Sequence, residues 1–170
     1  MKFFSPIALL AVALLAGSSA AVAAPPPIRT DLLPTTVPAG EGCDFALRVS
    51  GTDAKARVKT FKNGRQIISG KGYLLTYTNL EPSGKTVTFE SNGSAEITSA
   101  PDANNVVTVT STGSTGLILF STDASKVPGV ETPSAIQYTG RIVYTVDLDT
   151  GLFTLISASG QQRDLCAELA

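Results

Sequence analysis

Hydrophobic and polar residues alternate along most of the chain between residues 43 and 166. In the first stretch, Cys43, Phe45, Leu47 and Val49 alternate with Asp44, Ala46, Arg48 and Ser50. A period of two is typical of a strand with one buried face. The same reading predicts strands over 55–61, 65–69, 73–77, 87–89, 94–98, 106–112, 116–121, 135–148, 152–157 and 163–166. No stretch of residues 24–170 has convincing helical periodicity.

Turn-forming residues separate these stretches. Asn63-Gly64 and Asn92-Gly93 supply the positive φ angles that tight hairpin turns need. Gly113-Ser114 predicts another turn, and Gly140 predicts a bend within 135–148. Short turns favour an antiparallel meander. We therefore predict an all-β fold of about nine strands in a closed or nearly closed β-barrel, with a β-sandwich as the alternative.

The first 42 residues have a different composition. Lys2, the apolar run 7–16 and the small residues at 21–23 together form the pattern of a cleavable signal peptide over residues 1–23. Five of the ten prolines fall in residues 24–42, which predicts a Pro-rich flexible tail that cannot pair in a sheet. Residues 43–170 are then a single β domain, without a transmembrane segment in the mature form.

Cysteine usage fits this expectation of export. The chain has two cysteines, Cys43 and Cys166, and an even count in an exported protein predicts one disulfide. The bond would join the start of the first strand to the end of the last, as closure into a barrel requires. A sandwich could also join these ends, across its two layers. We expect a location outside the cell or on the exterior of the cell envelope.

Charge and composition exclude several function classes. Loss of residues 1–23 leaves 12 basic and 14 acidic residues, a net charge of −2, so we expect no nucleic-acid partner. The chain has no histidine, which excludes Ser-His-Asp and Cys-His hydrolases and zinc sites built on imidazole. Ser125 lies next to Lys126, the wrong spacing for a Ser-x-x-Lys pair.

Asp149-Thr150-Gly151 spells the catalytic triplet of aspartic proteases, which need two carboxylates that share a proton. The loose second candidate, Asp123-Ala124-Ser125, lacks the glycine, and Leu152 stands where a small residue is usual. We interpret Asp149 as a turn residue. Asp147 to Gly151 is also a fragment of a calcium-loop pattern, but it lacks the third ligand.

Two further patterns have ordinary explanations. Asn92-Gly93-Ser94 has the form of an N-glycosylation sequon, which matters only in a eukaryotic host. Thr108, Thr110 and Thr112 form one row on a strand face, as a solvent-facing strand does. We expect no catalytic residue, no cofactor and no metal site.

Short motifs spread over residues 43–166 carry a resemblance. They are Cys43-Asp44-Phe45, Asn63-Gly64-Arg65, Tyr138-Thr139-Gly140-Arg141 and Asp164-Leu165-Cys166. With these motifs the chain resembles a group of small secreted actinobacterial proteins of uncharacterised function. The resemblance implies export and a β fold, and it implies no activity.

Together these features predict an exported, non-catalytic protein that acts by binding. A barrel would hold a small apolar ligand or an envelope component in its cavity. A sandwich would favour an adhesion or inhibitor module whose loops make the contacts. An enzyme of unrecognised type is the second alternative.

Overall fold

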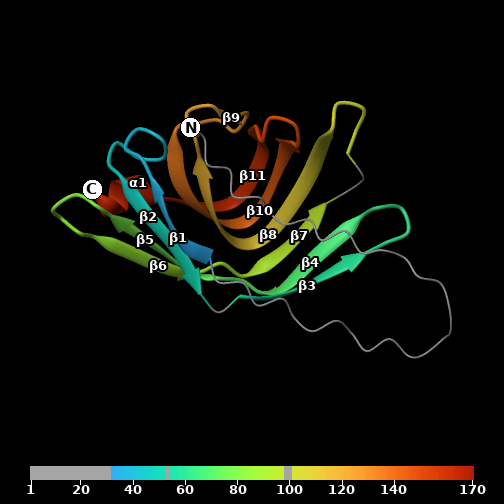
Figure 1. The fold of residues 1–170 in the computed structure, drawn as a ribbon, viewed down its shortest axis with the longest axis horizontal. Coiled ribbons are helices and arrows are strands. Elements are labelled where there is room, and N and C mark those ends of the chain that lie inside the picture. The colour runs from blue at the N-terminus through green and yellow to red at the C-terminus, as the bar shows by residue number, and fades with distance from the viewer. Residues whose placement is uncertain (1–31, 53, 98–100) are drawn as a thin grey trace.

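The computed structural model describes residues 32–52, 54–97 and 101–170. Within these residues, eleven strands form two sheets (Figure 1). The small sheet has the order β1-β2-β5-β6 and contains β1 (Leu32–Val37), β2 (Leu47–Thr52), β5 (Leu74–Asn79) and β6 (Thr86–Glu90). The large sheet has the order β3-β4-β7-β8-β10-β11-β9 and contains β3 (Lys55–Thr60), β4 (Gln66–Lys71), β7 (Gly93–Ile97), β8 (Val106–Leu119), β9 (Ala124–Ser125), β10 (Ser134–Asp147) and β11 (Phe153–Asp164).

Three stretches of chain pass from one sheet to the other with almost no interruption. β2 leads into β3, β4 into β5, and β6 into β7. In each case the chain keeps its direction, because each half pairs antiparallel with the matching half of its neighbour. Asn92 therefore lies in the two-residue link between β6 and β7, and the hairpin turn predicted at Asn92-Gly93 is wrong. The strand continues because Gly93 pairs with both neighbouring strands.

A row of glycines crosses the large sheet. Consecutive pairing partners on five neighbouring strands are Gly70, Gly93, Gly113, Gly140 and Gly160. Glycine in a strand interior permits a sharp bend and a close backbone approach. Figure 1 shows β8, β10 and β11 arching steeply across the molecule.

This row explains one confirmed prediction and two errors. Gly140 has a φ of 151°, so the predicted bend within residues 135–148 is confirmed. Gly113-Ser114 was expected to be a turn, but Gly113 bends a single 14-residue strand, β8. The residues predicted as separate strands at 152–157 and 163–166 likewise belong mostly to one strand, β11.

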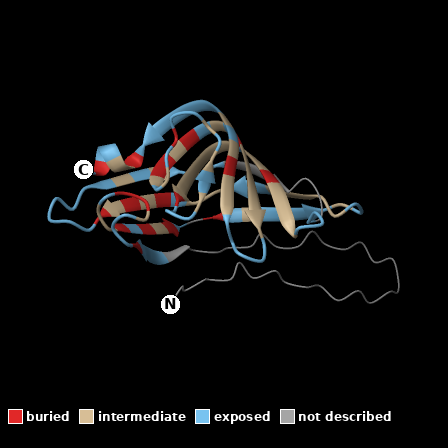
Figure 2. Cartoon of the chain, turned by 90° about the horizontal axis from the view of Figure 1, so that it is seen from above, coloured by how far each residue is buried: buried red, intermediate tan, exposed pale blue. Residues whose placement is uncertain are grey.

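The two sheets overlap as a sandwich-like arrangement and do not close, so the predicted barrel is wrong and the sandwich alternative fits better. β8 pairs with β7 only as far as Gly113, and its later residues cross over the small sheet. β6, which precedes β7 in the chain, pairs in the small sheet and not with the second half of β8. The two sheets therefore stay unjoined at this point and do not close into a barrel. Buried residues gather where the sheets overlap (Figure 2). This first core contains Val37, Cys43, Leu47, Val49, Leu75, Tyr77, Ala135, Leu165 and Leu169.

A second core lies on the other face of the large sheet. Its buried residues are Leu119, Val130, Ile136, Tyr138, Ile142 and Leu155. Val130 belongs to the connection between β8 and β10, which also carries β9. This connection covers the apolar side chains of β8, β10 and β11, so the large sheet is apolar on both of its faces here.

Two expectations about the ends of the domain need correction. Residues 24–42 were expected to form a tail that cannot pair, but residues 32–37 form β1 and pair antiparallel with β2. Pro34 is tolerated because β1 is an edge strand. The predicted absence of helix fails at α1 (Leu165–Leu169), whose N-terminus is capped by the Asp164 side chain. The predicted signal peptide, residues 1–23, lies outside the described residues.

The disulfide between Cys43 and Cys166 is confirmed, with the two Cα atoms 5.4 Å apart. Cys43 lies between β1 and β2 of the small sheet, and Cys166 lies in α1, directly after β11 of the large sheet. The bond therefore joins the two layers of the sandwich. Its predicted role in closing a barrel is wrong.

Candidate functional site

An apolar pocket of about 370 Å³ lies between the two sheets. Its lining from β8 comes from the part of that strand beyond its pairing with β7. Its lining residues are Thr35, Val37, Val49, Tyr73, Leu75, Tyr77, Ser91, Gly116, Ile118 and Phe120. We call it the wedge pocket. Its volume is in the range of small-molecule sites, which are mostly apolar with a few polar groups.

The wall of the wedge pocket follows from the alternation along β1, β2 and β5. Leu75 and Tyr77 point from β5 into the first core, and they are 6% and 2% exposed. Thr35 is the direct partner of Val49, so β1 and β2 present these side chains on the same face. Phe120 lies at the other side of the pocket, just after β8, and is 41% exposed. A large aromatic side chain is thus left half open to solvent beside a buried apolar wall.

Gly116 lets β8 approach the pocket wall closely. A Cβ atom there would lie 2.5 Å from the Tyr77 hydroxyl oxygen and 2.9 Å from Leu75 Cδ1. The Tyr77 ring stacks on Phe89 with the ring centroids 5.7 Å apart. Burial raises the pKa of the Tyr77 hydroxyl to about 12. The hydroxyl therefore stays protonated at neutral pH and keeps its capacity to donate a hydrogen bond.

A second pocket, of about 320 Å³, lies beside the disulfide. Three acidic residues line it, namely Asp44, Glu131 and Asp164. Asp164 is engaged in the fold, because one carboxylate oxygen accepts a hydrogen bond from the Ala167 backbone N–H at 3.0 Å. Among the described residues, no group of three or more His, Cys, Asp or Glu side chains is placed to hold a metal ion.

Asp149 lies in the turn between β10 and β11, as predicted. The residue that anchors this turn is Asp147, whose Oδ1 accepts the backbone N–H groups of Asp149 and Thr150 at 2.9 and 3.0 Å. These bonds, with that from Thr150 first, lower the pKa of the Asp147 carboxyl. Asp149 instead accepts a hydrogen bond from the Asn105 side chain at 2.7 Å. The turn thus uses both carboxylates to hold its own geometry and the neighbouring turn.

The other residues weighed as catalytic candidates also bond to the backbone around them. The Asp123 carboxylate accepts the N–H groups of Phe120 and Phe153, at 2.8 and 3.1 Å. The Ser125 hydroxyl accepts the Val127 N–H at 3.1 Å. These bonds position the connection that covers the second core.

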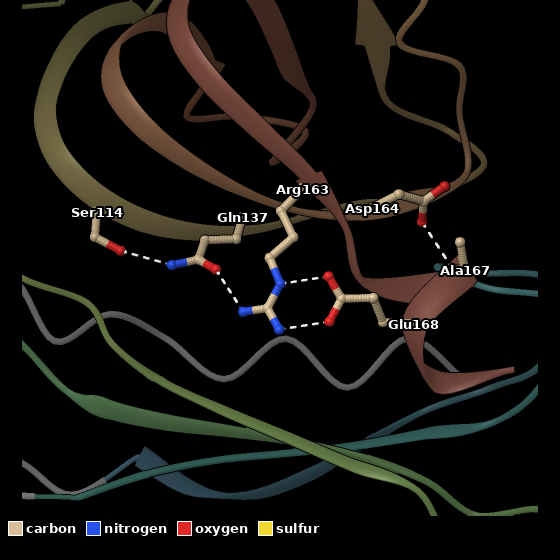
Figure 3. A network of polar contacts seen from close by, with 6 residues as sticks. All are labelled: Ser114, Gln137, Arg163, Asp164, Ala167 and Glu168. Atoms are coloured by element: carbon tan, nitrogen blue, oxygen red, sulfur yellow. Dashed lines mark hydrogen bonds and ion pairs between the residues drawn. The ribbon is translucent and has the colours of Figure 1, made fainter.

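A polar chain ties α1 to the large sheet (Figure 3). Gln137 donates from its amide to the Ser114 hydroxyl at 2.9 Å and accepts from Arg163 at 3.1 Å. Arg163 also forms a two-pronged ion pair with Glu168 of α1. The hydrogen bond from Arg163 lowers the pKa of the Glu168 carboxyl. This network of polar side chains holds the end of the fold near the disulfide in place.

No protein-family model, curated protein or solved structure matches this chain. Within the part of the chain that the structure describes, no helix has the length and apolar character needed to cross a membrane.

Sequence reasoning found the pieces of the wedge pocket but not the pocket. The alternation of Tyr73, Leu75 and Tyr77 predicted an inner strand face. Phe120 stands directly after Leu119 at the end of β8, and its exposure beside the pocket is seen only in the structure. What the pattern could not supply is the crossing of β8 over the small sheet, since that depends on the bend at Gly113.

Proposed function

We propose that this chain is an exported, non-catalytic binding protein that holds a small apolar ligand in the wedge pocket. The observation that carries the proposal is an apolar pocket of about 370 Å³ with a half-exposed aromatic residue, Phe120, at its edge. The location outside the cell rests on the signal-peptide pattern. A disulfide between Cys43 and Cys166 is compatible with it.

The polar groups around the pocket favour a ligand that is mostly hydrocarbon with one polar end. Thr35 and Ser91 line the pocket beside Val37, Val49 and Ile118. Binding sites of this kind take their affinity from the apolar wall and their orientation from a few polar groups. Burying apolar ligand surface would stabilise the complex by roughly 25 cal/mol for each Å² removed from water.

Titration with Nile red, a neutral apolar dye, tests the proposal. The dye avoids attraction to charged surface patches. We expect saturable binding of one dye molecule per chain. A Thr35→Trp variant should weaken it at least tenfold, because the new indole would fill the pocket from β1.

Thr36→Trp is the matched control. Thr36 is the next residue on the same strand and is exposed on the opposite face, opposite Arg48. It should bind the dye as the unchanged protein does. Equal loss in both variants, or no saturable binding at all, would count against the wedge pocket as the ligand site.

A further inference from the structure

The charges of the chain are strongly segregated. Residues 54–80 contain six Lys or Arg residues and no Asp or Glu, whereas residues 81–170 contain ten acidic and four basic residues. The six cations all fall in the β3–β4 hairpin, which forms the end of the molecule opposite α1 (Figure 1). The net charge of the chain is near neutral, but this end of the molecule is strongly basic.

Three of these cations form a straight row along one edge of the large sheet. Lys55, Arg57 and Lys59 are all exposed, and they occupy alternate positions of β3, the outermost strand. Alternate residues of a strand point to the same face and lie roughly 6.6 Å apart. We call Lys55, Arg57, Lys59 and Lys71 the basic edge.

The basic edge is not arranged for the stability of the sheet. Lys55 and Lys71 are direct cross-strand partners, and like charges placed opposite each other destabilise a strand pair. Within the described residues, no acidic side chain forms an ion pair with Lys55, Arg57, Lys59 or Lys71. An anion from outside the chain would relieve this repulsion.

The form of the basic edge selects the kind of anion. An evenly spaced row, rather than a pocket, fits a linear polymer with regularly repeated charges. Guanidinium groups such as that of Arg57 bind phosphate through two parallel hydrogen bonds. We propose that the basic edge binds a linear phosphodiester polymer of the cell envelope. Placing the partner in the envelope rests on the expected export of the chain, and not on the wedge pocket.

Two other polyanionic partners fit less well. Single-stranded nucleic acid is held by aromatic side chains on which bases stack. On this hairpin, Phe61 is covered by Lys59 and Arg65, at 5.0 and 4.5 Å from the ring centroid. The same coverage takes away the aromatic group that the hairpin tip would insert into a lipid surface.

Binding of poly(glycerol phosphate) by the intact protein tests the proposal. We expect binding that weakens steeply with salt, because each phosphate contact releases a counterion. The triple variant Lys55→Gln, Arg57→Gln, Lys59→Gln should bind at least about tenfold more weakly at 0.1 M salt, with a salt slope lower by about 2.

A second triple variant, Arg48→Gln, Lys85→Gln, Lys126→Gln, is the matched control. It removes the same charge from exposed positions outside the hairpin and should bind as the unchanged protein does. Equal loss in both triple variants would overturn the proposal.

Two comparison partners decide the source of the anion. Binding of single-stranded DNA or of anionic lipid vesicles as tight as that of poly(glycerol phosphate) would contradict the assignment to an envelope polymer. No binding to any of these, with aggregation of the basic-edge variant, would show that the lysines only protect an edge strand from pairing. Failure of the Nile red experiment would leave these results unchanged, because the basic edge shares no residue with the wedge pocket.

Discussion

Gly140 and Gly160 are direct partners on β10 and β11, and each lies against a carbonyl of the opposite strand. A Cβ atom on Gly140 would lie 2.1 Å from the Ser159 carbonyl oxygen, and one on Gly160 would lie 2.2 Å from that of Thr139. The bend of the large sheet therefore depends on two residues that have no side chain. Gly113 of β8 pairs with Gly140, so the same bend carries β8 across the small sheet and shapes the wedge pocket.

We expect Gly140→Ala to lower the free energy of unfolding by at least about 2 kcal/mol, because it combines a backbone clash with a positive φ. Urea denaturation measures the loss. Gly84→Ala is the control, since Gly84 has a φ of 59° but nothing within 4 Å of the added atom. It should cost about 1 kcal/mol. Similar losses in the two variants would contradict the importance of the close approach.

Removal of the disulfide should destabilise the fold without unpairing either sheet. The bond spans 123 residues, for which the chain-entropy model gives nearly 5 kcal/mol, while measured values are more often 2–4 kcal/mol. We expect the Cys43→Ser, Cys166→Ser double variant to melt well below the native protein and to aggregate more readily. An unchanged melting temperature would show that the two layers do not need this link.

The Tyr77 hydroxyl should lose its proton at a higher pH than an exposed tyrosine does. Its pKa is raised to about 12 by burial, so the neutral hydroxyl favours the folded state. The resulting stability is fully present below about pH 10 and is lost as the pH rises towards 12, by up to about 3 kcal/mol. Ultraviolet absorbance of tyrosinate follows the titration. In Tyr77→Phe this late step should be missing, and its persistence there would assign it to another tyrosine.

The turn between β10 and β11 should tolerate change at Asp149 better than at Asp147. Asp149→Asn keeps an oxygen acceptor for Asn105 and should cost at most about 1 kcal/mol. Asp147→Ala removes the acceptor of two backbone N–H groups and should cost more. Thermal melts of both variants provide the comparison. If Asp149→Asn proved the more damaging, our interpretation of this turn would be wrong.

The alternation of side chains predicted the β class and most strand positions, and the even number of cysteines predicted the disulfide. The local signals at Asn92-Gly93 and Gly113-Ser114 were misread as hairpin turns. The same residues that end a strand in a turn also bend a strand within a sheet, and only the pairing partners distinguish the two cases. Gly113 pairs with another glycine on each side, Gly93 on β7 and Gly140 on β10.

The architecture depends on whether these glycines end a strand in a turn or bend it within a sheet. A meander with tight turns closes into a barrel, whereas strands that bend across a glycine row divide between two sheets. The wedge pocket and the basic edge follow from that division, because one lies where the sheets part and the other at the far end of the large sheet. A single sequence contains no record of which glycines lie opposite one another.

Native mass spectrometry of the protein purified from its own host tests the central claim most directly. We predict that the folded protein carries a bound small molecule, which is released on unfolding and is apolar in character. The Thr35→Trp variant should be found without it, and Thr36→Trp should retain it. A native mass equal to that of the bare mature chain, or a ligand retained equally by Thr35→Trp, would contradict binding in the wedge pocket.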